Sequence, residues 1–135
     1  MPDTRASSAP DPASIRPGGD SDDQITIDVR TPAAGQVVLD VSGEVDMLTS
    51  PQLRTSVLEQ LEAGVELVVL ALDGVTFLGT SGLAVLIELR EAAHAAGVEL
   101  RLACTARRVL RPLAIAGLVP LFDIHETLEQ ALAAT

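Results

Sequence analysis

The chain has 135 residues, 47% of them hydrophobic, which suits one domain with a real core and excludes a disordered protein. Nine arginines, no lysine and nineteen acids give a net charge of −10, so no face can be strongly basic. Binding to nucleic acid or to an anionic membrane surface is therefore disfavoured, and the absence of Trp and Tyr removes the usual platforms for stacking bases.

One cysteine, Cys104, allows no internal disulfide, which fits a reducing compartment, and it is expected to be a small core residue. The sequence has no charged start followed by an apolar stretch and no apolar run long enough to cross a bilayer. We expect a cytoplasmic protein.

Residues 1–23 are rich in Pro, Ser, Ala, Gly and Asp, which predicts a disordered tail. Residues 24–135 should form the domain, with a formal charge of −7 from fourteen acids and seven arginines. Residues 25–29 and 37–41 alternate between apolar and polar, which predicts a hairpin with a loop of about five residues at 31–35.

Ser50-Pro51 predicts a helix start, with Ser50 as the cap, and Gly64 its end. Residues 67–72, LVVLAL, are typical of a central strand covered on both faces. The later pattern predicts a helix, a strand, a helix, a strand and a helix at 81–96, 98–102, 105–116, 121–124 and 127–134, with Pro112 kinking or delaying the second of these helices. Strands that alternate with helices imply crossover connections, so the fold class is α/β, with a mixed, mostly parallel sheet flanked by about four helices.

The turn Gly79-Thr80-Ser81-Gly82 separates two apolar runs, where a strand ends and a helix begins. Gly79 permits a tight turn and Gly82 a close backbone approach. Thr80 or Ser81 then stands at the helix N-terminus, beside free N–H groups and the positive end of the dipole. Its hydroxyl either caps the helix or receives a phosphoryl group, which would add charge and bulk to a docking surface.

A catalytic role for Ser81 is disfavoured. The nucleophile elbow needs glycine where this chain has Leu83, and Asp123 and His125 are two apart on one predicted strand, where they would compete for space. His94, His125 and Cys104 have no metal-ligand spacing, and His94 is expected to be a solvated surface residue. We therefore expect no enzyme activity and no cofactor.

Three segments, GEVD at 43–46, LVVLALD at 67–73 and VTFLGTSGL at 75–83, resemble the STAS domain, named for sulfate transporters and anti-sigma factor antagonists. The closest class is that of the bacterial anti-anti-sigma factors. The resemblance implies an anti-sigma factor antagonist that binds an anti-sigma factor with serine kinase activity and regulates sigma-factor-dependent transcription in a stress response. Phosphorylation at Ser81, with Thr80 as second choice, would switch it off, and a metal-dependent serine phosphatase would restore it.

The same resemblance implies a partner-binding surface made of Asp46, Glu44, Gly79, Thr80, Ser81 and Gly82. Gly79 departs from the family, which usually has an acid there. The alternative is a non-switching STAS subunit of a transporter, lipid-transport or stress-signalling complex, in which Ser81 is only a cap.

The sequence leaves two interpretations for several other polar residues. Asp46 and Glu44 are either solvated turn residues or part of the partner surface. Asp73 is expected to bond nearby loop backbone. Arg107, Arg108 and Arg111 form either a docking patch or, as we favour, a solvated helix face.

Overall fold

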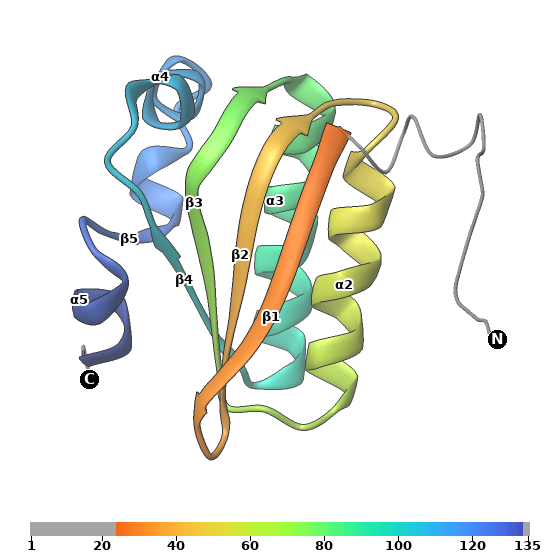
Figure 1. The fold of residues 1–135 in the computed structure, drawn as a ribbon, viewed down its shortest axis with the longest axis vertical. Coiled ribbons are helices and arrows are strands. Elements are labelled where there is room, and N and C mark those ends of the chain that lie inside the picture. Colours follow the sequence, from red (N-terminus) through yellow and green to blue (C-terminus); the bar gives the residue numbers. More distant parts are fainter. Residues whose placement is uncertain (1–23, 134–135) are drawn as a thin grey trace, which may run out of the picture.

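The computed structural model describes residues 24–133, so the predicted tail, residues 1–23, and the predicted last residue of the final helix, Ala134, lie outside it. Five strands form one sheet in the order β1-β2-β3-β4-β5 (Figure 1). The β1–β2 pair is antiparallel and the other three pairs are parallel, which confirms the predicted mixed, mostly parallel sheet. In chain order the elements are β1 (Ile25–Ala33), β2 (Gln36–Val45), α2 (Ser50–Glu62), β3 (Leu67–Leu78), α3 (Thr80–Ala96), β4 (Glu99–Ala103), α4 (Arg107–Ile115), the 3-10 helix η1 (Val119–Leu121), β5 (Asp123–His125) and α5 (Leu128–Ala133).

The sheet is a layer with helices on both faces. Helices α2 and α3 lie side by side on one face, and α5 lies on the other (Figure 1). Strand β3 is central, and its first half is buried on both sides: Val68 and Leu70 pack in the larger core with α2 and α3, while Val69 packs with Ala131 of α5. The prediction that LVVLAL is covered on both faces is confirmed.

The hairpin between β1 and β2 is tighter than predicted. Ala33 pairs with Gln36, so the loop is Ala34-Gly35 rather than residues 31–35, and Gly35 has a φ of 77°. A register shift between Arg30 and Ala33 lets β1 continue through Pro32. Proline is tolerated there because β1 is an edge strand of the sheet that residues 24–133 form, with no strand of this range on its outer side.

Helix α2 begins one residue earlier than predicted, and its cap residue is Thr49 rather than Ser50. The Thr49 hydroxyl accepts a hydrogen bond from the Asp46 N–H (2.9 Å) and donates one to the Glu44 carbonyl (2.7 Å). Thr49 is buried, so it fixes the loop between β2 and α2 rather than the helix end itself.

The C-terminal elements differ from the prediction in their limits. Helix α4 begins at Arg107, two residues later than predicted, and contains Pro112. Strand β5 begins at Asp123 rather than residue 121, because residues around Pro120 form η1 instead.

The two sides of β3 end differently. Strand β2 follows β3 to its last residue, pairing Val45 with Leu78 across two register shifts. Strand β4 pairs only with Leu67–Ala71, and helix α4 packs beside the rest of β3. The continuation of β3 beyond the predicted residue 72 carries the chain to the start of α3, where the candidate site lies.

Candidate partner-binding and phosphorylation site

The turn from β3 into α3 places Thr80 and Ser81 in the first turn of the helix, with Thr80 exposed and Ser81 half-buried. Gly79 occupies the N-cap position, and no side-chain cap hydrogen bond is present. The interpretation of the hydroxyl as a simple cap is therefore wrong. Gly79 has a φ of −88° and a ψ of 179°, extended backbone that any residue adopts, so the turn does not use the conformational freedom of glycine that was expected to permit a tight turn.

Gly82 is buried and allows α3 to approach β2, as predicted. A Cβ atom at this position would lie 2.7 Å from Cδ1 of Leu78 and 2.8 Å from Cγ1 of Val45. The small residue is thus required by packing rather than by backbone conformation.

The loop after β2 lies beside this turn, because the Gly79 N–H donates to the Val45 carbonyl (2.9 Å). In this loop, Oδ1 of Asp46 accepts hydrogen bonds from the N–H groups of Leu48 (2.9 Å) and Thr49 (3.1 Å). Asp46 therefore shapes the loop. Glu44 is exposed near the end of β2, where it pairs with Phe77 of β3.

Exposed apolar side chains surround the turn, and sequence reasoning missed them. Met47 and Leu48 are 75% and 64% exposed in the loop, Phe77 is 53% exposed at the end of β3, and Ile115 is 78% exposed at the end of α4. Large apolar side chains that face solvent at one end of a domain are typical of a docking surface. The only signal in the sequence was that these residues stand outside the apolar pattern of their elements.

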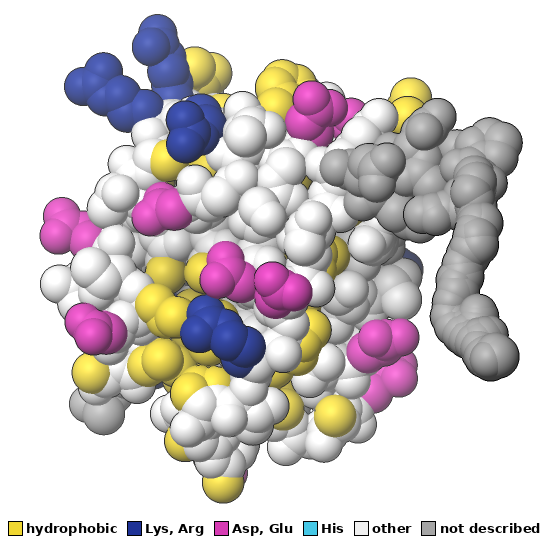
Figure 2. Space-filling model, viewed as in Figure 1, with side chains coloured by type: hydrophobic (Ala, Val, Ile, Leu, Met, Phe, Trp, Pro, Cys, Tyr) yellow, Lys and Arg dark blue, Asp and Glu magenta, His cyan; other side chains and the backbone are white. Residues whose placement is uncertain are grey.

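A groove of about 860 Å³ runs between the start of α3 and helix α4. It is lined by Phe77, Leu78, Gly79, Thr80, Leu83, Arg107, Arg108, Arg111, Pro112, Ile115 and Ala116. The three arginines are exposed, and basic side chains gather over α4 in Figure 2. The structure therefore brings Arg107, Arg108 and Arg111 to the same groove as Thr80. The sequence alone favours a solvated helix face for these arginines, with no relation to the turn.

Two other predicted residues have structural roles. Oδ1 of Asp73 accepts hydrogen bonds from the N–H groups of Thr105 (2.8 Å) and Ala106 (3.1 Å), so the prediction that it bonds loop backbone is confirmed. Cys104 is a buried core residue, as predicted. Burial, and then the negative charge of Asp73, raises the pKa of the Cys104 thiol from 9.0 to about 11.

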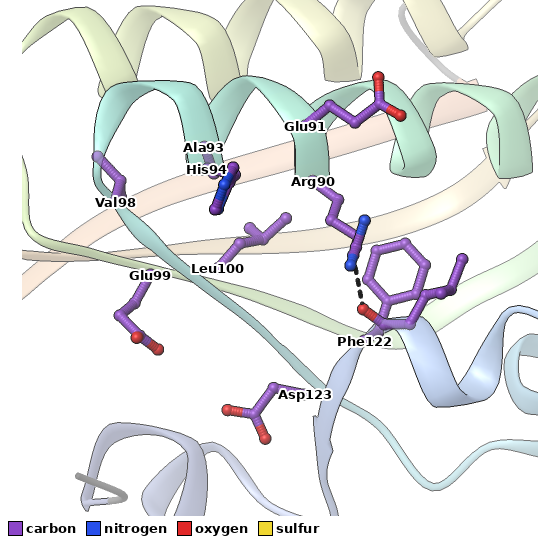
Figure 3. Close-up of a pocket in the computed structure, with 10 residues that line it drawn as sticks. Arg90, Glu91, Ala93, His94, Val98, Glu99, Leu100, Phe122 and Asp123 are labelled. Carbon is purple, nitrogen blue, oxygen red and sulfur yellow. Dashed lines mark hydrogen bonds between the residues drawn. The ribbon is translucent and has the colours of Figure 1, made fainter.

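A second cleft, of about 420 Å³, lies between α3, β4 and the start of β5. Figure 3 shows Arg90 reaching across it, where its Nε donates to the Leu121 carbonyl (2.7 Å). The acids at its rim, Glu91, Glu99 and Asp123, come from three elements, and His94 is exposed, as predicted.

Asp123 and His125 point the same way along β5 and approach one another: Nε2 of His125 lies 3.0 Å from Oδ1 of Asp123, without the geometry of a hydrogen bond. Asp123 also faces the buried Arg101, whose Nε lies 3.4 Å from Oδ2. Within residues 24–133 no three His, Cys, Asp or Glu side chains are grouped to hold a metal ion. No helix in this part of the chain is long and apolar enough to span a membrane.

Comparison with known proteins assigns the fold to a family. The family model described as STAS domain matches residues 24–131. A comparison with curated protein sequences finds no match. Among solved structures, an anti-sigma factor antagonist from Mycobacterium paratuberculosis is 31% identical, with a TM-score of 0.75 over 82% of this chain and 92% of that one.

Two further structures share the fold at lower identity. The Bacillus cell fate determinant SpoIIAA, in its phosphorylated form, is 18% identical, with a TM-score of 0.63 over 79% of this chain and 96% of that one. A sulfate transporter family protein from Wolinella succinogenes is 19% identical, with a TM-score of 0.67 over 77% of this chain and 87% of that one.

The chain belongs to the STAS domain family. Its identity to the mycobacterial protein, over nearly the whole of that protein, associates it with the anti-sigma factor antagonists of the family, as the sequence resemblance implied.

Proposed function

We propose that this protein is an anti-sigma factor antagonist that binds an anti-sigma factor with serine kinase activity, and that phosphorylation at Ser81 ends this binding. The similarity to the mycobacterial antagonist supports the general role. The observation that carries the finer proposal is the position of Ser81: it lies in the uncapped first turn of α3, among exposed apolar residues of the neighbouring loop and strand.

The proposed binding surface divides into residues that contact the partner and residues that shape the surface. Thr80 and Glu44 are exposed and available for contact, and Met47, Leu48 and Phe77 add apolar area around them. The shaping residues, Asp46, Gly79 and Gly82, hold the loop and let α3 approach β2.

A phosphoryl group on Ser81 would act through charge and bulk. The free N–H groups of the first turn of α3 favour an anion, so the modified domain need not unfold. The group adds a charge of about −1.5 to −2 at pH 7. On a domain whose formal charge is already −7, it would repel an acidic partner surface and cover apolar contact area.

The proposal places the protein in the cytoplasm as a non-enzymatic regulator of sigma-factor-dependent transcription under stress. A metal-dependent serine phosphatase would remove the phosphoryl group and restore binding. We propose no direct contact of the protein with nucleic acid or membrane, because its net charge of −10 disfavours binding to anionic surfaces.

Incubation with the anti-sigma factor and ATP, followed by mass spectrometry of the peptides, tests the switch. We expect phosphate on Ser81 and loss of the complex on the same time scale. Ser81→Ala should bind constitutively, and Ser81→Glu should bind weakly.

Thr80→Ala is the matched control, because it removes the neighbouring hydroxyl and leaves Ser81 in place. If phosphate appears on neither Ser81 nor Thr80 while the complex still forms, the switch is wrong and the binding role stands. That result would favour the alternative of a non-switching STAS subunit, for which Gly79 in place of the family's usual acid is the specific support. Transporter genes beside this one would favour the same alternative, whereas a gene for a histidine-kinase-like ATPase would favour the switch.

A further inference from the structure

The groove between α3 and α4 is a basic site on an acidic domain. Residues 24–135 contain seven arginines and fourteen acids, and three of the seven arginines line this groove. Arg108 is fixed at its edge by a hydrogen bond from Nε to the Val75 carbonyl (2.9 Å), whereas Arg107 and Arg111 are exposed, and neither forms an ion pair with another residue of the described part. The lining includes the exposed apolar side chains of Phe77 and Ile115, so the groove fits an acidic segment that also has an apolar side chain.

The strand register shows which part of this chain can reach the groove. Ile25, the first residue of β1, pairs with Gly43 of β2, and Gly43 pairs with Val75 of β3. Val75 is the residue whose carbonyl Arg108 binds. The segment before Gln24 therefore leaves the sheet level with Val75, two strands away, at the end where β2 and β3 finish (Figure 1), and Arg108 lies beyond Val75 on α4.

The distance suits a short span of chain. Two strand spacings, from β1 to Val75 of β3, are about 10 Å, and five extended residues cover about 16 Å. Asp20 lies five residues before Ile25, so the chain can pass β2 and bring its carboxylate towards the long side chains of the arginines, whereas Asp22 and Asp23 stay nearer the exit point. Ile15, ten residues before Ile25, can reach the apolar side chains of the groove.

The charge of the segment selects the same place. Residues 1–23 contain five aspartates and two arginines, and the rest of the chain has a formal charge of −7. Most of the domain surface therefore repels the segment, including Glu44, which is exposed on β2 between the exit point and the groove. The groove beside α4, with its three arginines, instead attracts an acidic segment. Because the segment is tethered to the domain, its effective concentration at the groove is in the millimolar range, so a weak intrinsic affinity of the segment for the groove is enough.

We propose that the acidic segment formed by residues 1–23 docks in the groove between α3 and α4, with its aspartates on Arg107 and Arg111 and Ile15 against Phe77 and Ile115. Because Thr80 lines this groove, the docked segment covers part of the surface around Ser81. Competition with the anti-sigma factor is a consequence that rests on the proposed function, whereas the docking itself does not.

Paramagnetic relaxation in the full chain tests the docking without any partner. Ser14→Cys provides a thiol beside Ile15 for a nitroxide label. Cys104 is buried, and its thiol has a raised pKa of about 11, so it should resist labelling at neutral pH. We expect the amide signals of Phe77, Thr80 and Ile115 to lose most of their intensity at low salt, and to recover it at about 1 M salt, where the Debye length is about 3 Å.

Matched variants separate docking from chance contact. Arg107→Gln with Arg111→Gln should abolish the broadening, and so should Asp20→Asn combined with Asp22→Asn and Asp23→Asn. Arg54→Gln, an exposed arginine of α2, should leave it unchanged. Broadening that is uniform, centred elsewhere, or insensitive to the α4 arginines overturns the proposal, including the case in which the groove serves only an acidic partner.

A binding assay then tests the consequence. The variant with neutralised aspartates should bind the anti-sigma factor several-fold more tightly than the natural chain, and Arg54→Gln should not. If broadening is present but the anti-sigma factor does not bind either chain, the proposed function fails while the docking stands. If the natural chain and the neutralised variant bind equally, the competition is wrong.

Discussion

The two ends of helix α3 are built on different principles. At the C-terminal end, Gly97 adopts a left-handed conformation, with a φ of 73°, and its N–H donates to the carbonyls of Ala93 and His94. At the N-terminal end, Gly79 is extended and no side chain caps the helix. There the helix is positioned by Gly82 against β2.

The C-terminal end of α3 is stabilised by local backbone hydrogen bonds, whereas the N-terminal end is positioned by tertiary contacts. The C-terminal end is satisfied by its own backbone, so it needs no neighbour. The N-terminal end leaves N–H groups free and depends on contact with Val45 and Leu78 for its position. An end that keeps unused donors while being held rigidly is suited to accept an anion, and this is the end that carries Ser81.

The largest expected change comes from filling the contact at the N-terminal end. Gly82→Val places methyl groups where Leu78 and Val45 already lie within 2.8 Å of a Cβ position, so overpacking should lower the free energy of unfolding by about 1–3 kcal/mol. Denaturant unfolding followed by circular dichroism measures it. Ala84→Val, at an exposed position of the same helix, controls for the helix propensity of valine and should cost less than about 0.7 kcal/mol. Equal losses in the two variants would contradict the tertiary role of Gly82.

A smaller change is expected at the C-terminal end. A Cβ on Gly97 would meet nothing within 4 Å, so the cost of Gly97→Ala is that of the left-handed backbone alone, about 1 kcal/mol. Gly64 follows α2 with a φ of 83° and equally open space, so Gly64→Ala should cost the same. Thermal unfolding of both variants checks this. A clear difference between them would show that one of the two ends also depends on tertiary contacts.

The sequence predicted the parts of this comparison that depend on local patterning. The apolar run at 67–72, the inward face of α3 and the stop at Gly97 all follow from periodicity and from the preference of glycine for left-handed backbone. The continuation of β3 to Leu78 did not follow, because Asp73-Gly74 is typical of a turn, and only the shifted pairing of Gly74 with Ser42 keeps the strand extended.

The sequence predicted the hydroxyl and acidic residues of the candidate site, but not its exposed apolar side chains or its arginines. Ser81, Thr80 and the loop at Asp46 were placed together through the family resemblance, and the structure brings them to one end of the sheet. The arginines of α4 were assigned to solvent, because the sequence pattern ended the central strand at residue 72 and gave no sign that β3 continues to Leu78, past the end of β4 and beside α4. The groove is therefore a product of strand lengths, which periodicity does not fix.

The smallest expected change in stability, and the one that sharpens the role of the N-terminal end, is Gly79→Asp. The extended N-cap conformation suits aspartate, which stabilises an N-cap over glycine by a few tenths of a kcal/mol. Its Cβ would lie 3.0 Å from Cε2 of Phe77, an exposed ring that can turn aside, so the net change in the free energy of unfolding should be near zero.

The same substitution introduces the acid that the sequence resemblance implies for this position, two residues before the proposed phosphorylation site. We therefore expect faster phosphate incorporation at Ser81 in Gly79→Asp, followed by mass spectrometry over time with the anti-sigma factor and ATP. Gly79→Asn is the matched control, because it offers the same cap without the charge. If the two variants are phosphorylated at the same rate, the charge has no part in the transfer, and if the natural chain shares that rate, Gly79 is a neutral replacement. If only the aspartate variant is faster, a carboxylate at the start of α3 promotes phosphate incorporation, and Gly79 makes the proposed switch slower.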